Sequence, residues 1–225
     1  GVLASAVSMD KSYAKPIFAS AGLNVAAGTV VTSSKFELPS NLKYPLFVKP
    51  ARSGSSRGTT KVKTAAELTA AVEHALTFDT KVIIEQAIIG KEIECAVLQA
   101  DGKTSASPVG EIAISDKYEF YDFQAKYLDN SMQLVSPADL PAGIEEKIQK
   151  AALLAFSAAG CEGLARIDFF YSNDDQIVIN EINTMPGFTP TSVYPKLIEK
   201  IGISYQQLIT KLIETAQNRS LNVTR

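Results

Sequence analysis

Residues 163–189 read GLARIDFFYSNDDQIVINEINTMPGFT. Two apolar runs, 164–171 and 176–183, flank the polar tetrapeptide 172–175, and this pattern predicts two neighbouring strands joined by a tight connection. Charged and amide side chains recur at alternate positions within both runs. Because residues two apart on a strand share a face, these polar groups should gather on one face of the strand pair.

The expected pairing of the two strands brings opposite charges together. We expect Tyr171 to pair with Gln176 across the connection. In that register Arg166 falls opposite Glu181, and Asp168 is a diagonal neighbour of Glu181. Apolar neighbours would leave the carboxylates half exposed, where like charges repel strongly unless a positive group intervenes.

The oxygen-rich side chains of this strand pair predict a magnesium site. Asp168, Glu181 and Asn183 offer carboxylate and amide oxygens, which suit Mg²⁺ when substrate phosphates fill its other positions. Arg166 would then neutralise a transferring phosphoryl group. The alternative is a salt-bridge cluster on the sheet surface, but the segment Met185–Gly187 that follows the second strand favours the metal site.

A second polar segment, 48–58, reads VKPARSGSSRG and follows a short strand expected at 46–49. Glycines let the backbone turn its N–H groups toward an anion, serines add donors, and Lys49 supplies a charge at the strand end. This composition is typical of a phosphate-binding loop. It matches neither standard nucleotide-binding glycine motif, so a flexible surface hairpin is an equal alternative.

The segment Ile83–Ile88 is an apolar strand that ends in polar residues and is followed by Glu92. A chain crossing between two lobes can offer backbone groups to an adenine edge and a carboxylate to ribose hydroxyls. From the residues alone, a buried strand with ordinary surface glutamates is the favoured interpretation.

The segment 115–131 is polar and aromatic without a clear period, as in an ordered functional loop. It contains Lys126 between aromatic residues. Such a lysine can enter a cleft when a loop closes and excludes water from a reactive intermediate. A solvated loop lysine is the default alternative.

Periodicity and turn signals predict the other elements. A helix should run from a cap at Ser8 to Gly22, with Lys11 near its start. A small α+β lobe should follow, and then a hairpin that pairs 92–99 with 107–114 around the turn at 101–102. The expected elements of the small lobe are strands at 28–32, 46–49 and 81–85 and a helix at 65–76, and further helices are expected at 145–159 and 205–218.

Composition excludes several functional classes. The chain of 225 residues has 22 basic and 24 acidic residues, a net charge of −2, which gives no general attraction to nucleic acid or anionic lipid. No apolar run approaches the roughly 18 residues of a membrane span. Cys95 and Cys161 lack paired spacing, so a reducing, cytoplasmic setting is expected. The single histidine, His74, disfavours a His-activated nucleophile.

These features, in this order and spacing, resemble the D-alanine-D-alanine ligase family of the ATP-grasp superfamily. The resemblance extends through nearly the whole chain. It implies an α+β ATP-grasp fold in which two α+β lobes sandwich the nucleotide, with a small central lobe at 1–91 and a large catalytic lobe at 92–225 that carries a lid at about 115–131. The segments that carry the resemblance are 8–11, 47–56, 120–128, 163–168 and 181–189.

The resemblance also implies a role for particular residues. Two Mg²⁺ ions, with Mn²⁺ as a substitute, would be held by Asp168, Glu181 and Asn183. The residues implied in catalysis are Arg166, Lys126, Tyr127, Gly187 and Ser192, the last of which would help to seat the second substrate's carboxylate together with Val193. The residues implied in ATP binding are Lys11, Lys49, Ser55, Ser56, Glu85, Gln86, Ala87, Ile88, Glu92, Lys126, Asn180 and Glu181.

In the resembled family, ATP phosphorylates the carboxylate of a first D-alanine, and the amine of a second D-alanine attacks the acyl phosphate to give the dipeptide for peptidoglycan precursors. Tyr127 resembles the dipeptide-forming members. Ligation of D-lactate, D-serine or another amine remains an alternative, as does a nucleotide-binding regulatory module without turnover. Gln124 and Arg57 depart from the residues usual in the family, which affects the expected lid and loop contacts.

The resemblance further implies an N-terminal domain that contributes to binding of the first D-alanine. No such domain is recognisable in these residues, so we expect the chain alone to bind ATP without efficient ligation. Members of the family are usually homodimers, and the same is expected of the full-length protein.

Overall fold

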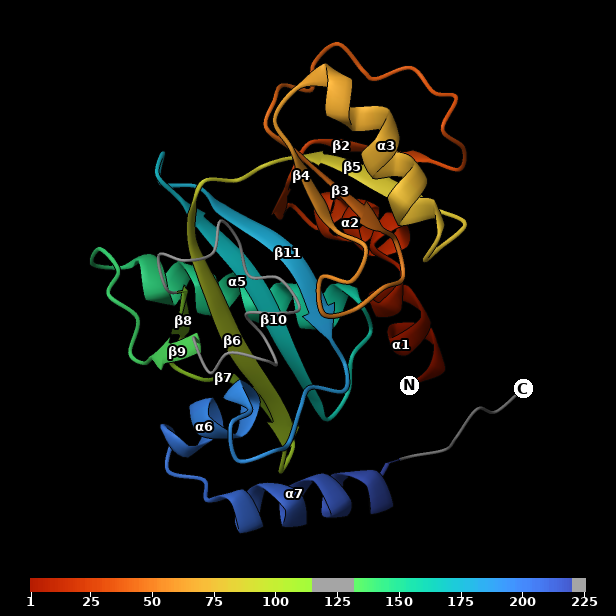
Figure 1. Ribbon diagram of the computed structural model, residues 1–225. Coiled ribbons are helices and arrows are strands. Elements are labelled where there is room, and N and C mark those ends of the chain that lie inside the picture. Colours follow the sequence, from red (N-terminus) through yellow and green to blue (C-terminus); the bar gives the residue numbers. More distant parts are fainter. Residues whose placement is uncertain (115–131, 220–225) are drawn as a thin grey trace.

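The computed structural model describes residues 1–114 and 132–219, which form two lobes, each built on its own sheet (Figure 1). The smaller lobe stands over one end of the larger sheet (Figure 1). Helices and strands occur in both lobes, and most strand pairs are antiparallel. The α+β class predicted from the sequence is therefore confirmed.

The smaller lobe is a four-stranded antiparallel sheet with a helix on one face. In spatial order its strands are β2 (Gly28–Val31), β5 (Val82–Gln86), β3 (Leu46–Pro50) and β4 (Thr60–Val62). The helix α3 (Ala65–Leu76) lies across this sheet (Figure 1). Its apolar stripe recurs at helical spacing and is buried against the strands. The residues of that stripe are Leu68, Ala71, Val72 and Ala75.

The larger lobe has helices on both faces of its sheet. In spatial order its strands are β1 (Asn24–Val25), β11 (Ile177–Asn183), β10 (Leu164–Ser172), β6 (Gly90–Ala100), β8 (Gly110–Ile114) and β9 (Met132–Val135), and β7 (Lys103–Ala106) pairs with β6. Alternate residues of β6 point to opposite cores. Cys95 and Val97 pack with α5 (Ile144–Ala158), whereas Ala96 and Leu98 pack with α6 (Val193–Glu199) and α7 (Tyr205–Gln217).

The first residues form two helices, α1 (Val2–Met9) and α2 (Lys11–Ser20), where one helix from Ser8 was predicted. The predicted cap at Ser8 is wrong, because Ser8 is a buried residue of α1. Asp10 is the cap instead: its extended backbone separates the helices, and its carboxylate accepts the N–H of Ser12 at 3.0 Å. Gly22, with φ of 88°, follows the end of α2 as expected.

Residues before Gly28 pack with the larger sheet, although the predicted division groups 1–91 in the smaller lobe. β1 pairs in parallel with β11, and Phe18 of α2 is buried in the core beneath the larger sheet. α2 therefore belongs to the larger lobe but begins beside the smaller one, since the N–H of Lys11 donates to the carbonyl of Ala51 at 3.0 Å.

The predicted hairpin is wrong in its partner strand. β7, rather than 107–114, returns from the turn at 101–102, and β8 pairs only with Ile93 and Glu94 near the other end of β6. Pro108, which lacks an N–H donor, separates the two partners. At the break, the hydroxyl of Ser107 accepts the N–H of Ala96 at 3.1 Å.

Other helices agree with prediction to within a residue at either end. The elements that were not predicted are β1, β4, β7, β9 and α6. Among residues 1–114 and 132–219, no helix has the length and apolar character required to cross a membrane.

Candidate functional site

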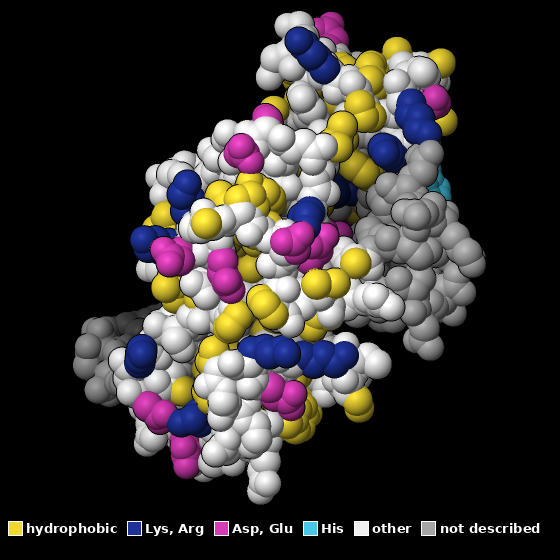
Figure 2. All heavy atoms as spheres, turned by 90° about the vertical axis from the view of Figure 1, so that its left-hand side faces the viewer, with side chains coloured by type: hydrophobic (Ala, Val, Ile, Leu, Met, Phe, Trp, Pro, Cys, Tyr) yellow, Lys and Arg dark blue, Asp and Glu magenta, His cyan; other side chains and the backbone are white. Residues whose placement is uncertain are grey.

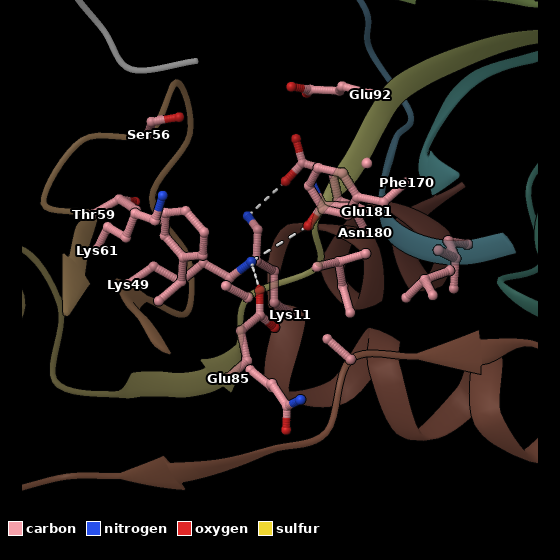
Figure 3. Close-up of a pocket in the computed structure, with 18 of the residues that line it drawn as sticks. Lys11, Lys49, Ser56, Thr59, Lys61, Glu85, Glu92, Phe170, Asn180 and Glu181 are labelled. Carbon is pink, nitrogen blue, oxygen red and sulfur yellow. Dashed lines mark hydrogen bonds and ion pairs between the residues drawn. The ribbon is translucent and has the colours of Figure 1, made fainter. Parts of the chain in front are cut away.

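A cavity of about 520 Å³ lies between the two lobes (Figures 2 and 3). Basic side chains line the recess seen between the lobes in Figure 2. Its walls come from α2, from β3, β4 and β5 of the smaller sheet, from β6, β8, β10 and β11 of the larger sheet, and from the loop before β4. Within the described residues, every predicted nucleotide-binding side chain lines this one cavity. They are Lys11, Lys49, Ser55, Ser56, Glu85, Gln86, Ala87, Ile88, Glu92, Asn180 and Glu181.

The register of β10 and β11 differs from the predicted one. Asp168 lies opposite Glu181, and Arg166 lies opposite Asn183, because the connection is one residue longer than expected and Asn180 is an extra residue in β11. The two differences together shift the register by two residues. Because strand side chains alternate between faces, the polar residues still lie on the predicted common face of the strand pair. This bulge turns both Asn180 and Glu181 toward the cavity (Figure 3).

Lys11 and Glu181 form an ion pair across the cavity, with Nζ and Oε2 2.8 Å apart (Figure 3). Lys11 is the first residue of α2, and its Nζ also donates to the carbonyl of Ser53 at 3.4 Å. Burial alone would lower the pKa of Lys11. The negative charge of Glu181 outweighs burial, so the pKa of Lys11 is raised.

Glu85 is buried between two lysines. Its Oε2 is 2.9 Å from Nζ of Lys15, and its Oε1 contacts Nζ of Lys49. Burial would raise the pKa of Glu85, but the two ammonium charges lower it to about 2. The pKa of Lys49 is lowered, chiefly by burial. The charge of Glu85 opposes this shift, and the ammonium groups of Lys15 and Lys11 add to it. Lys49 also donates to Oδ1 of Asn180 at 3.4 Å.

Arg166 joins the acidic groups farther along β10. Its guanidinium donates to both oxygens of Asp168, at 2.8 and 2.7 Å, and its Nε is 3.0 Å from Oε2 of Glu94. Burial would lower the pKa of Arg166, but the charges of Asp168 and Glu94 raise it well above its ordinary value. Asn183 donates its amide to Oδ2 of Asp168 at 3.0 Å.

This acidic end matches a magnesium site in donor chemistry. Two carboxylates and an amide come from facing positions of two paired strands, and Mg²⁺ favours one or two carboxylates completed by phosphate oxygens. Arg166 and Lys11 hold the carboxylates in place. Among the described residues, no group of three or more His, Cys, Asp and Glu side chains is placed to hold a metal.

Comparison with known proteins identifies the family. The family model described as the D-alanine-D-alanine ligase C-terminus matches residues 17–214. The chain belongs to the D-alanine-D-alanine ligase family. The D-alanine-D-alanine ligase of Shouchella clausii is 50% identical over 225 residues, and that of Pseudarthrobacter chlorophenolicus is 47% identical over 231 residues. Both alignments cover 97% of this chain and 60% of the relative, so the chain spans well under two thirds of these curated relatives.

Solved ligase structures share the fold. The VanG D-Ala:D-Ser ligase from Enterococcus faecalis superposes with a TM-score of 0.84 at 42% identity, covering 95% of this chain and 63% of that one. The D-alanine-D-alanine ligase from Bacillus anthracis complexed with ATP gives a TM-score of 0.79 at 30% identity, covering 96% and 68%. The predicted ATP-grasp fold is thereby confirmed.

The loop that the ligase resemblance places over phosphates has an unusual backbone. Ser55 and Ser56 both adopt positive φ, 53° and 54°, and Gly58 has φ of 74°. Non-glycine residues rarely adopt this region, and such strain gathers at ligand-binding segments. Gly58 is also crowded, because a Cβ there would lie 2.6 Å from the ring of Phe78.

The catalytic residues predicted from the ligase resemblance lie outside the lining of the cavity or outside the described residues. Arg166, Gly187 and Ser192 do not line the cavity, and neither do Asp168 and Asn183. Gly187 and Ser192 lie together: a Cβ on Gly187 would be 2.6 Å from Oγ of Ser192, which accepts the N–H of Thr189 at 2.9 Å. Lys126 and Tyr127 lie outside the described residues.

Three lysines of the ligase cavity, Lys15, Lys61 and Lys91, were not predicted as site residues. Lys15 lies one helical turn after Lys11, a spacing that would have placed both on one face of α2. Lys61 comes from β4, a strand of three residues that carries too little pattern to be recognised (Figure 3).

Proposed function

We propose that the cavity between the lobes binds ATP and that the chain supplies the nucleotide-binding and phosphoryl-transfer part of a D-alanine-D-alanine ligase. One observation carries this proposal. Three ammonium groups and two carboxylates form one buried cluster, which leaves an excess of positive charge beside a strained glycine-serine loop. Such a cluster suits a polyphosphate, and the similar ligase from Bacillus anthracis was solved as a complex with ATP.

The adenine would lie along Gln86–Ile88, where the chain passes from one lobe to the other. The N–H of Gln86 donates to Ala27 at 2.8 Å, and that of Ala87 donates to Pro45 at 3.1 Å. Both N–H groups are already hydrogen-bonded within the protein. The groups proposed to contact the base are therefore the carbonyl oxygens of this segment and the N–H of Ile88. Glu92, also in the cavity, would accept from the ribose hydroxyls.

Phosphoryl transfer to the carboxylate of a first D-alanine would take place toward Arg166. Lys11 and Lys49 would neutralise the phosphates, and Arg166 would neutralise the developing charge. Mg²⁺ held by Asp168, Glu181 and Asn183 would polarise the phosphoryl oxygens. The amine of a second D-alanine would then attack the acyl phosphate, displace inorganic phosphate and give the dipeptide, while Lys126 and Tyr127 in the proposed lid would keep water out.

The second substrate has two candidates. The curated relatives are named D-alanine-D-alanine ligases, but the structure with a TM-score of 0.84 is a D-Ala:D-Ser ligase. We propose D-alanine, with Gly187 and Ser192 near its carboxylate, in a cytoplasmic homodimer that serves peptidoglycan precursor synthesis.

The test is ADP release by the complete protein that contains these residues, with each amine or hydroxy acid in turn. Release that requires D-alanine and yields D-alanyl-D-alanine supports the proposal. Preferred use of D-serine or D-lactate as second substrate contradicts the assigned specificity, and no D-alanine-dependent release contradicts the activity.

A further inference from the structure

Lys15 is a buried lysine whose position needs an explanation. It is 9% exposed and comes from the same helix as Lys11, one turn later. Burying an ammonium group is costly unless it is paired and hydrogen-bonded. Its partner is Glu85, itself 5% exposed, with Nζ and Oε2 2.9 Å apart. The proposed reaction gives Lys15 no contact with the substrates.

Glu85 has one lysine on each oxygen, and the two lysines come from different lobes. Lys49 belongs to β3 of the smaller sheet and also reaches Asn180 of the larger one. Lys15 belongs to α2, which is anchored in the larger core through Ala14 and Phe18. Lys49 borders the open cavity together with the strained loop, as Figure 3 shows.

If a nucleotide binds here, Glu85 and a phosphate compete for the ammonium group of Lys49. To reach the phosphate, Lys49 must weaken its contact with Glu85. Without Lys15, this would leave a carboxylate of 5% exposure with neither of its two contacting ammonium groups, which would be strongly destabilising. A second cation on the other oxygen removes that cost, and Lys15 occupies this place.

We propose that Lys15 is a positioning residue: it stays as the counter-ion of Glu85 and thereby lets Lys49 leave Glu85 for a phosphate of the nucleotide. The inference rests on the proposed function. The charged groups near Glu85 are Lys49 from β3 and Lys15 and Lys11 from α2, and β11 contributes the neutral amide of Asn180 beside Lys49. Replacing Lys15 by an apolar residue would hold Lys49 on Glu85.

The binding experiment compares a non-hydrolysable Mg·ATP analogue with adenosine, which has no phosphate. Lys15→Met should weaken binding of the analogue by about tenfold, or about 1.4 kcal/mol, and leave adenosine binding unchanged. Lys15→Arg should restore binding of the analogue.

Two results would overturn the inference. Equal weakening of both ligands by Lys15→Met would indicate a structural role only. Unchanged binding of the analogue would remove the need for Lys15.

A second measurement is independent of nucleotide. The side-chain carboxyl carbon of Glu85, followed by ¹³C NMR during acid titration, should titrate at higher pH in Lys15→Met than in the unaltered chain, and Lys15→Arg should reverse this. Identical titration curves would contradict the counter-ion role. If the unaltered chain binds neither ligand, the proposed function fails, and this titration alone decides whether Lys15 holds Glu85.

Discussion

Asp168 and Glu181 lie directly opposite each other on β10 and β11 because Asn180 is an extra residue in the second strand. If β11 continued without the bulge, Asp168 would face Asn180, and Glu181 would alternate toward the core side. The bulge thus places the two carboxylates on the same face while Asn180 contacts Lys49.

Deleting Asn180 should therefore be tolerated, because Ile179, Glu181 and Ile182 would then alternate regularly, with Glu181 still opposite Asp168 and Ile182 still in the core. We expect a loss of about 1 kcal/mol, from the contact of Asn180 with Lys49. Deleting Ile179 also removes the bulge but moves Asn180 into the core position opposite Phe169, which we expect to cost about 3 kcal/mol or more. Urea unfolding of both deletion variants measures the difference, and equal stabilities would refute the described register.

Arg166→Met should be strongly destabilising, because Asp168 and Glu94 are buried and would lose this cation. The expected loss is about 3–5 kcal/mol at neutral pH. Without Arg166 the folded-state pKa values of these carboxyls should lie above their unfolded values. The stability of the variant would then be highest below the unfolded pKa, where both carboxyls are protonated. It would fall as pH rises through the folded-state pKa and the buried carboxyls become charged.

Urea unfolding of the Arg166 variant at pH 7 and pH 5 tests the direction of this pH dependence. The difference in the free energy of unfolding between the unaltered chain and the variant should be smaller at pH 5. Arg57→Met, at an exposed position, is the matched control and should change stability little. A deficit that grows on acidification would be inconsistent with the buried ion cluster.

Glu85 should make folding sensitive to acid. Its pKa is lowered from 4.5 to about 2 in the folded chain, so its contribution is fully present above pH about 4.5 and is lost as pH falls toward 2. The shift corresponds to about 3 kcal/mol. Asp79, with a pKa of about 2 beside Arg52, titrates in the same range. The difference between the unaltered chain and Glu85→Gln therefore isolates Glu85, and parallel stability curves would exclude its contribution.

Two glycines of the phosphate-loop segment should respond differently to alanine. Gly58 has positive φ, and its added Cβ would meet Phe78 and Pro50 within 3 Å, so Gly58→Ala should cost about 1–3 kcal/mol. Gly54 has no atom within 4 Å of an added Cβ, so Gly54→Ala should be nearly neutral. Thermal unfolding of both variants is the measurement, and similar losses would argue against the described loop geometry.

The sequence predicted those features that depend on local pattern. The bounds of α3 follow from its apolar stripe, and the strands that carry Asp168 and Glu181 follow from their alternation. The cap at Asp10 was missed because Ser8, two residues earlier, is an equally suitable cap residue by type. Only the tertiary packing, which buries Ser8 within α1, distinguishes the two.

Features that depend on contacts distant in sequence could not be predicted. The bulge at Asn180 requires the register of β10 to be known, and the role of Lys15 requires Glu85 to be placed beside α2. Likewise, the packing of α2 with the larger sheet depends on the pairing of β1 with β11, more than 150 residues away. Short elements such as β4 carry too few residues for a periodic signal.

Nucleotide binding tests the central claim most directly. Isothermal titration calorimetry of the chain with a non-hydrolysable Mg·ATP analogue should show one site. Lys49→Met should weaken it at least about tenfold, whereas Lys43→Met, at an exposed position in the same lobe, should bind as the unaltered chain does. Absence of binding by the unaltered chain, or equal affinities for the Lys49 and Lys43 variants, would contradict the assignment of this cavity.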